Sequence, residues 1–377
     1  MDQILIVGYS ITAFSIVTLF LKQNKKVPSQ YAILLLFIWF IRFFCLYLED
    51  HVNLYNFPYL IVWDQNLFFL DGVLLYWYIA SYDNRLKIKN QLLSLIPFFI
   101  SLIYTTVIYF SFDTEKLVHV HNQIIENLLA GDYKISLRSA VNILVMIAVN
   151  CFFLFKSVKL LKEYKLLLLD NYSTITDLQL NWLRKLVFVW LVLFYIPFVF
   201  YFIDGVSSIF PIQYIEIVAE SGMVMTAIFF SANAIIQKYP KSSLEKFSSS
   251  TPNSPSNEDS RDSELKFEMI KNFMQENRPY LDVNLTLESL ANNLDMKSSE
   301  LSRIVNTQNK TNFHEFVNSY RIEQIKTELL STKEQIIIIA YNNGFNSKST
   351  FNGVFKRFTG MTPSQFRKTN TSESLTS

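Results

Sequence analysis

The sequence has 377 residues, of which 50% are hydrophobic, 16% aromatic and 18% charged, with 34 basic residues against 32 acidic ones. This composition is too apolar for an ordinary soluble protein, and the presence of only two cysteines, Cys45 and Cys151, argues against a disulfide scaffold. The net charge is only +2, so the overall charge does not indicate a nucleic-acid-binding protein. The charge of each segment therefore has to be considered separately.

Seven apolar runs in the first 240 residues are each long enough to cross a bilayer. They cover residues 4–21, 31–48, 60–80, 92–112, 140–155, 186–203 and 212–236, and the fifth is the shortest. No basic segment precedes the first run and no small-residue cleavage site follows it, so we expect a span rather than a cleaved signal peptide. The runs therefore predict a seven-helix transmembrane bundle over residues 1–241, in contact with membrane lipid.

Lysine and arginine residues fall mainly in the loops after the first, third and fifth runs, whereas the loops after the second and sixth runs contain neither. Because these residues concentrate in cytoplasmic loops, the pattern predicts an N-terminus outside the cell and a C-terminus inside it. We therefore expect a multi-pass protein of the cytoplasmic (inner) membrane. The basic residues that set this orientation are Lys22, Lys25, Lys26, Arg85, Lys87, Lys89, Lys156, Lys159, Lys162, Lys165, Arg184 and Lys185.

Five charged residues lie inside the runs, where a charge is costly and usually has a role. Asp64 and Asp71 lie on one face of the third predicted span, and Glu216 and Glu220 lie on one face of the seventh. Together with Arg42 in the second span, they fit two interpretations. One is a pocket open to the outside for a small ligand or peptide with polar or cationic groups, and the other is an internal ion-pair network that fastens the helices.

The sequence offers little support for catalysis or metal binding. In the outer loop 111–139, His119 and His121 lie near Asp113 and Glu115, but this spacing is loose for a metal site and favours an ordinary exposed loop. There is no glycine-rich phosphate loop, and no nucleophile with a placed base can be identified. We therefore predict that the protein is not an enzyme and needs no metal or cofactor.

The composition changes abruptly after the last run. Residues 242–263 are rich in Ser, Pro and Asn and have too little apolar surface to fold, so they predict a disordered linker. A flexible chain of this length has a mean reach of about 26 Å, which would hold the next domain close beneath the membrane. We expect that domain to cover residues 264–370, followed by a disordered tail at 371–377.

The C-terminal domain contains the same predicted arrangement of elements twice: a short helix, a tight turn and a second helix with a polar or basic outer side. In the first copy, Thr286 is the expected N-cap of the short helix. Asp295 and Met296 are expected to form the turn. The inward residues of the second helix are Leu301, Ile304 and Val305.

The second copy follows a long helix predicted over about residues 313–330. Its short helix includes four consecutive isoleucines, 336–339, which on their own favour a strand, but the surrounding pattern favours a helix. Gly344 occupies the position where a helix ends on a left-handed residue. The inward residues that follow are Phe345, Phe351, Val354, Phe355 and Phe358.

Several short motifs near the C-terminus keep a characteristic spacing. They are Ile339-Ala340, Gly344-Phe345, Phe351, Phe355-Lys356 and Gly360-Met361-Thr362-Pro363. In these motifs, roughly the last 100 residues resemble the DNA-binding domain of AraC/XylS-type transcription regulators. The resemblance implies a double helix-turn-helix domain that binds double-stranded promoter DNA in the major groove.

The resemblance also implies which residues contact DNA, because in this family exposed positions on the second helix of each motif read the sequence. Gly353 departs from the family pattern, in which Arg is usual, and this leaves base reading by the second motif open. Between residues 341 and 368 every charged residue is basic, which favours contact with phosphates. The assigned residues are Ser298, Ser299, Ser302 and Arg303 in the first motif and Lys348, Ser349, Asn352, Lys356 and Arg357 in the second.

These features predict an all-α, membrane-integrated, one-component DNA-binding transcription regulator. An external or intramembrane signal would act through seven transmembrane helices on promoter binding. We expect a homodimer, because one domain with a weak second reader would bind poorly alone, and RNA polymerase is a further candidate partner. The alternatives are a membrane transporter or membrane enzyme with a regulatory cytoplasmic DNA-binding domain, and a bundle that only anchors that domain.

Overall fold

The computed structural model describes residues 2–22, 27–51, 65–83, 86, 88–111, 113–129, 137–175, 181–190, 212–237 and 257–373. Within these ranges the chain is helical, and extended pairing is limited to one isolated bridge between Tyr172 and Thr286. The all-α prediction is therefore confirmed for the described ranges. The chain divides into two compact units, the first comprising residues 1–164 and 180–239 and the second residues 165–179 and 240–377.

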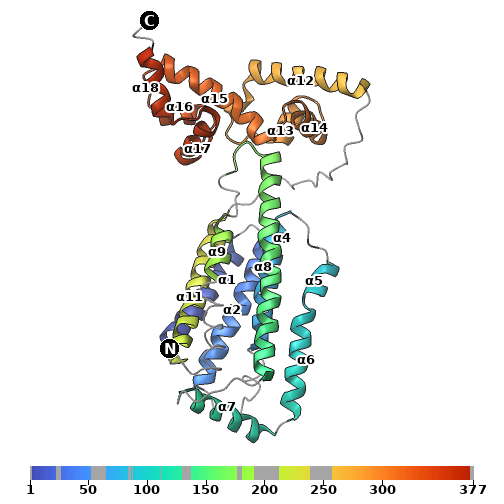
Figure 1. The fold of residues 1–377 in the computed structure, drawn as a ribbon, viewed down its shortest axis with the longest axis vertical. Helices are drawn as coiled ribbons and strands as arrows, with labels where there is room; N and C mark the ends of the chain where they lie inside the picture. The colour runs from blue at the N-terminus through green and yellow to red at the C-terminus, as the bar shows by residue number, and fades with distance from the viewer. Residues whose placement is uncertain are drawn as a thin grey trace. The chain divides into compact units, whose positions relative to one another are not determined.

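The first unit is a bundle of helices that run side by side, with α7 lying across one end (Figure 1). Helix α1 packs against α2 and α11, and α2 also packs against α4. The elements are α1 (Asp2–Leu21), α2 (Val27–His51), η1 (Phe68–Leu70), α4 (Asp71–Ala80), η2 (Ser81–Asp83), α5 (Ile88–Ser94), α6 (Ile96–Ser111), α7 (Thr114–Leu129), α8 (Leu137–Asn171), α9 (Asn181–Trp190) and α11 (Ile212–Ile236).

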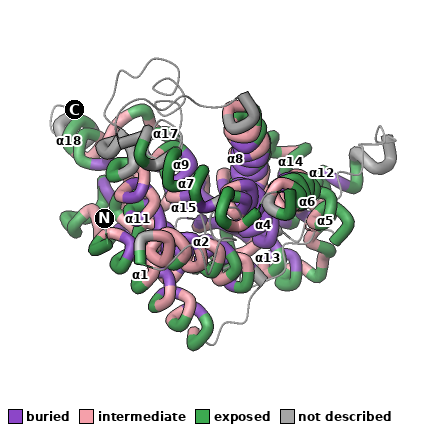
Figure 2. Tube along the Cα trace, turned by 90° about the horizontal axis from the view of Figure 1, so that it is seen from below, coloured by how far each residue is buried: buried purple, intermediate pink, exposed green. Residues whose placement is uncertain are grey.

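Five helices in the described ranges are long and apolar enough to cross a membrane: Asp2–Leu21, Pro28–Glu49, Ile88–Ile108, Ala140–Asn171 and Ile217–Ile236. Large apolar side chains on their outward faces are exposed, including Phe20 at 78% and Phe155 at 72%. Figure 2 shows exposed residues along α1, α5 and α6, whereas α4 is buried. The third and sixth predicted runs lie partly outside the described residues, so a total of seven spans stays a prediction.

One end of this unit brings together chain segments that are distant in sequence. Lys22, just after α1, donates a hydrogen bond from Nζ to the carbonyl oxygen of Ile235 near the end of α11. Trp182 Nε1, at the start of α9, donates a hydrogen bond to Gln237 Oε1, which follows α11, at 2.7 Å. The end of α1, the start of α9 and the end of α11 therefore meet, as an alternating up-and-down bundle requires.

Helix α8 is longer than expected. The fifth predicted run ended at residue 155, but the helix continues to Asn171 without interruption. Within the first unit, the ring of Tyr164 in α8 packs edge-on against the ring of Tyr82 in η2, with 5.6 Å between their centroids. The boundary between the two compact units falls directly after Tyr164, so the last turns of α8 belong to the second unit.

The outer loop 111–139 was expected to be an ordinary loop, and this expectation is wrong over much of its length because α7 occupies Thr114–Leu129. Apolar residues recur in this segment at helical spacing, and Val118 is 1% exposed. A helix of this kind buries its apolar stripe against the bundle, which an irregular loop could not do. His119, on the same helix, is exposed.

The second unit contains the predicted C-terminal domain. Helix α12 begins at Asn257, so residues 257–263 of the predicted linker are helical, while 242–256 lie outside the described residues. Four consecutive isoleucines begin α16, which confirms the helical prediction there. The elements are α12 (Asn257–Asn277), η4 (Pro279–Leu281), α13 (Leu287–Asn293), α14 (Ser298–Gln308), α15 (Phe313–Ser331), α16 (Ile336–Asn342), α17 (Lys348–Thr359) and α18 (Pro363–Glu373).

Two separate hydrophobic cores organise this unit, and α15 contributes to both. The first core joins α12, α13, α14 and the first half of α15, which supplies Phe313, Phe316 and Val317. The second joins α16, α17 and the second half of α15, which supplies Ile322, Ile325 and Leu329. The unit therefore consists of two small helical bodies connected by one continuous helix.

Candidate nucleic-acid interface

The first motif is built from α13 and α14. Thr286 caps α13 as predicted: its Oγ1 accepts a hydrogen bond from Ser289 N, and Ser289 Oγ accepts one from Thr286 N, both at 3.0 Å. The chain then turns at Asp295, whose φ is 52°, and Met296 N donates a hydrogen bond to Ala291 O at 2.9 Å. This turn closes the end of α13 and directs the chain into α14.

The second motif, built from α16 and α17, has the same turn. Gly344 has φ 81°, and Phe345 N donates a hydrogen bond to Ala340 O at 3.1 Å, as Met296 does to Ala291 in the first motif. The left-handed residue is Asp295 in one copy and Gly344 in the other. Ser347 then caps α17, because its side chain accepts a hydrogen bond from Thr350 N.

The buried residues of α14 and α17, the second helices of the two motifs, show which positions on these helices are equivalent. Leu301, Ile304 and Val305 of α14 are buried at the same spacing as Phe351, Val354 and Phe355 of α17. With this register, each outward position of α14 has one equivalent on α17. The equivalent pairs are Ser298 with Lys348, Ser299 with Ser349, Ser302 with Asn352, and Arg303 with Gly353.

All nine predicted contact residues lie outside the two cores. Six are exposed and three half-buried, the half-buried ones being Ser298, Ser302 and Asn352. Two of the exposed cations also have partners in the protein. Arg303 Nη1 lies 3.3 Å from Ser263 Oγ on α12, and Arg357 Nη1 lies 3.5 Å from Glu315 Oε1 on α15. Both arginine side chains are exposed, so each can turn from its protein partner to a ligand at a small cost in free energy.

Gly353 lies on the exposed side of α17. A Cβ atom built there would have nothing within 4 Å apart from its own helix and chain neighbours, so the fold does not require glycine at this position. The first motif carries Arg303 at the equivalent position. The absence of a side chain at residue 353 therefore has no packing reason in the described structure.

The motifs also differ in charge. From Leu287 to Gln308 the first contains the carboxylates Glu288, Asp295 and Glu300 and the cations Lys297 and Arg303. The second, from residue 336 to 359, contains three cations and no carboxylate. The electrostatic attraction for a phosphate backbone is therefore concentrated on α17.

Arg367, the next cation along the chain, has a structural role. Its Nε donates a hydrogen bond to Leu329 O at 3.1 Å, and its Nη1 donates one to Glu334 O at 2.8 Å. These bonds fasten α18 to the end of α15 and to the loop that follows it. Arg367 is thus a positioning residue for the second motif.

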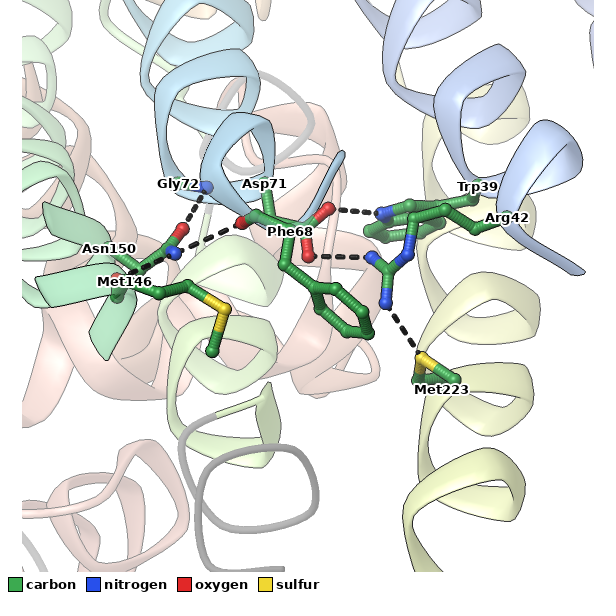
Figure 3. A network of polar contacts seen from close by, with 8 residues as sticks. All are labelled: Trp39, Arg42, Phe68, Asp71, Gly72, Met146, Asn150 and Met223. Atoms are coloured by element: carbon green, nitrogen blue, oxygen red, sulfur yellow. Dashed lines mark hydrogen bonds and ion pairs between the residues drawn. The ribbon is translucent and has the colours of Figure 1, made fainter. Parts of the chain in front are cut away.

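Two of the five charged residues predicted inside the spans form a buried pair (Figure 3). Arg42 Nη1 lies 2.7 Å from Asp71 Oδ2, and Trp39 Nε1 donates a hydrogen bond to Asp71 Oδ1 at 3.0 Å. The Arg42 guanidinium lies 3.5 Å from the centroid of the Phe68 ring and donates to Met223 Sδ at 3.0 Å. The cluster joins α2, η1, α4 and α11, in agreement with the interpretation of an ion-pair network that fastens helices.

An amide extends this polar cluster to α8 (Figure 3). Asn150 Oδ1 accepts a hydrogen bond from Gly72 N at 2.7 Å, and Asn150 Nδ2 donates to the carbonyl oxygens of Phe68 and Met146, each at 3.0 Å. The bonds satisfy the backbone where η1 passes into α4. This function of Asn150 was missed in the sequence, where a single amide in an apolar run carries no pattern.

Among the three remaining candidate residues, one has a described side chain. Glu220 is buried on α11. Asp64 and the side chain of Glu216 lie outside the described residues. A ligand pocket formed by all five charged residues therefore stays a prediction.

The C-terminal part of the chain is similar to known helix-turn-helix proteins. Residues 290–369 match the helix-turn-helix domain family. An uncharacterized HTH-type transcriptional regulator of Staphylococcus aureus strain COL is 39% identical over 84 residues, which are 22% of this chain and 11% of that protein. The melibiose operon regulatory protein of Escherichia coli K12 is 27% identical over 109 residues, which are 29% of this chain and 35% of that protein.

Among solved structures, the C-terminal domain of the two-component response regulator yesN from Fusobacterium nucleatum is 31% identical, with a TM-score of 0.25. The match covers 27% of this chain and 98% of that one. The C-terminal part is thus a helix-turn-helix domain of the AraC type, as the sequence motifs predicted. The chain spans 11% of the length of the Staphylococcus aureus relative, so the match concerns this domain and not the whole protein.

Proposed function

We propose that this protein is a membrane-integrated, DNA-binding transcription regulator in which a seven-helix membrane domain senses a signal and controls promoter binding by the C-terminal domain. The observation that carries the proposal is the pair of equivalent helix-turn-helix motifs on one connecting helix. Helix α15 has 19 residues, which corresponds to about 28 Å. This length suits two reading helices in successive major grooves, which are about 34 Å apart.

The DNA contacts we propose divide into two kinds. Arg303 and Asn352 would form base contacts, Arg303 with guanine and Asn352 with adenine. The exposed cations of the second motif, Lys348, Lys356 and Arg357, would contact phosphates and position the domain. A second copy of the chain would compensate for the missing Arg at Gly353, so we propose a homodimer as the active form.

Membrane integration is supported by the apolar helices and by the side on which their ends lie. The ends of α1 and α11 and the start of α9, which meet in the first unit, all border segments predicted to be cytoplasmic from their basic residues. Residues 165–179, another predicted cytoplasmic loop, belong to the same compact unit as the helix-turn-helix domain. Segments that pack together must lie on one side of the membrane, so the C-terminal domain would be cytoplasmic.

The proposal is tested with the full chain in lipid-bilayer discs and a pool of random double-stranded DNA. Repeated selection should enrich a sequence with two half-sites about 10 base pairs apart. Binding to the enriched sequence should exceed binding to unrelated DNA by about a thousandfold or more at one fixed salt concentration. Recovery of DNA without sequence preference, with binding that only follows salt, would remove sequence-specific regulation as the function.

A further inference from the structure

The end of α8 and the residues after it are part of the DNA-reading unit. We name residues 172–175, which follow α8, the strap. Ser173 N donates a hydrogen bond to Leu285 O at 3.1 Å, and Ser173 Oγ donates a second one to the same oxygen at 2.7 Å. Tyr172 pairs with Thr286 through an isolated antiparallel bridge. Because Thr286 is the N-cap of α13, the strap is attached where the first motif begins.

Arg321 provides the second attachment of the strap. This side chain in the middle of α15 is 0% exposed, and a buried cation is tolerated only when its donors are satisfied. Its Nη1 donates to Thr174 Oγ1 at 3.2 Å and its Nη2 donates to Ser173 Oγ at 3.1 Å. The strap thus supplies acceptors for a charge whose other hydrogen bonds in the described part of the chain go to neutral carbonyl and amide oxygens.

Arg321 also lies at the junction of the two motifs. On the side of the first motif, its Nε donates to Tyr280 O at 2.7 Å and its Nη2 to Asp282 O at 2.8 Å. On the side of the second, a Cβ atom at Gly344 would come within 2.8 Å of Arg321 Nε, and the Phe345 ring lies 5.7 Å from the guanidinium. One side chain therefore contacts the loop before the first motif, the turn of the second motif and the strap.

We propose that the strap is the element through which the membrane domain sets the relative position of the two reading helices. Helix α8 is continuous from a candidate membrane span to the strap, so a shift or rotation of the span moves the residues that satisfy Arg321. With the strap docked, Arg321 holds both motifs in one arrangement that fits two successive major grooves. With the strap withdrawn, Arg321 loses acceptors and the two motifs lose their fixed arrangement. The inference rests on the proposed function, because it assigns the path by which that function is controlled.

A conservative double variant tests the docking. Ser173→Ala with Thr174→Val removes two side-chain acceptors of Arg321 and the Ser173 Oγ bond to Leu285 while keeping the size of Thr174. The matched control is Ser319→Ala with Thr327→Val, two α15 residues whose hydroxyls bond to their own helix backbone. In full-length protein in lipid discs, the double variant should bind the selected DNA sequence about tenfold more weakly, with unrelated DNA bound as before.

Hydrogen–deuterium exchange in the same samples shows whether the strap has moved. Amides of the strap and of residues 280–286 should exchange faster in the double variant and not in the control. Unchanged exchange together with unchanged sequence discrimination would overturn the proposal, as would an equal loss of binding to selected and unrelated DNA. If the wild-type protein itself selects no sequence, the proposed function fails instead, and the two failures are therefore distinct.

Insertion of one residue distinguishes α8 from the linker as the path of control. One Ala between Lys165 and Leu166 rotates the end of α8 by about 100° and displaces it by about 1.5 Å. One Ala between Ser248 and Ser249, in the predicted linker, is the control. In cells, promoter occupancy should change several-fold with the α8 insertion and stay constant with the linker insertion. The reverse outcome, or equal effects, would overturn the role of the strap.

Discussion

The two helix-turn-helix motifs have equivalent turns, but their second helices carry different chemistry. Helix α14 presents Arg303 in a segment where carboxylates outnumber cations, whereas α17 presents three cations and has Gly353 at the position of Arg303. The motif best equipped to read a base is thus poorly equipped to attract phosphates, and the reverse holds for the other. Under the proposed function, base specificity and attraction for phosphates are therefore divided between the two copies of one motif.

The motifs also differ in how they are stabilised. The first core around α14 uses Leu301, Ile304 and Val305. The second uses aromatic rings packed edge to face, with the Phe355 centroid 5.7 Å from that of Phe351 and 5.5 Å from that of Phe366. Helix α17 also has a side-chain N-cap, which α14 lacks. Helix α17, which has Gly353 at the position of Arg303, is therefore the helix with the side-chain cap and the aromatic contacts.

The largest expected effect is a loss of stability in the second core that leaves the first core unchanged. Phe355→Ala should destabilise the second motif by about 3 to 5 kcal/mol, because a 0% exposed aromatic side chain leaves a cavity. Hydrogen–deuterium exchange of the full chain should show α16 and α17 opening more readily than α13 and α14. The matched control is Phe358→Ala, since Phe358 is 41% exposed and its loss should cost far less. Equal loosening of both motifs would show that α15 makes them one cooperative body.

Lowering the pH should destabilise the first motif, and the junction of the two motifs at Arg321, before the rest of the domain. His314, at the start of α15, is the only histidine after residue 121, and burial lowers its pKa to about 4, with Arg357 and Arg321 adding to the shift. The unfolded chain, with a pKa near 6.5, therefore binds more protons than the folded one between about pH 6.5 and 4. The contribution of neutral, buried His314 to the free energy of unfolding is fully present above pH 6.5 and is lost as the pH falls toward 4.

This dependence can be measured against a His314→Gln variant, in which the carboxylates titrate as before. Between pH 7 and pH 5, the free energy of opening of α13 and α14 should fall by about 2 kcal/mol more in the wild type than in the variant. Hydrogen exchange measures this opening, and the exchange rates are corrected for the intrinsic effect of pH. An equal fall in both proteins would mean that His314 is hydrated in the folded state.

How much was predictable from the sequence depended on the range of the interaction. The cap at Thr286, the left-handed turn at Gly344 and the helix over the four isoleucines follow from neighbouring residues, and all were predicted. The docking of Ser173 on Arg321 joins residues 148 positions apart, and no local pattern records it. Arg321 did give one signal, because at helical spacing it lies on the same face as the apolar residues Val317 and Ile325.

The contacts of the first unit also divide into those that the sequence predicted and those that it left open. The alternation of basic loops predicted an orientation, but the pair of Arg42 with Asp71 depended on how two helices pack, and the sequence left two interpretations open. The extension of α8 beyond its apolar run was missed because its last turns are rich in lysine, which ends a hydropathy signal without ending a helix.

A smaller effect separates base reading from phosphate attraction. Arg303→Ala should weaken binding to the selected sequence by about 1 to 3 kcal/mol and reduce discrimination at one base pair. Lys356→Ala, on the basic face of α17, should weaken binding to all sequences alike and reduce the dependence on salt. Affinities for the selected sequence and for its single-base variants, measured at several salt concentrations, test both. Unchanged discrimination with Arg303→Ala would remove this residue from the base readers.

The smallest effect tests the equivalence of Arg303 and Gly353 directly. Gly353→Ala should stabilise α17 by up to about 1 kcal/mol, because alanine favours a helix and a Cβ atom has open space there. Gly353→Arg should add discrimination at the half-site bound by α17, since it places on α17 the side chain that α14 already presents. Selection of DNA by the wild type and both variants measures the effect. If Gly353→Arg binds more tightly to every sequence alike, the added charge acts on phosphates, and the second motif is a positioning element and not a reader.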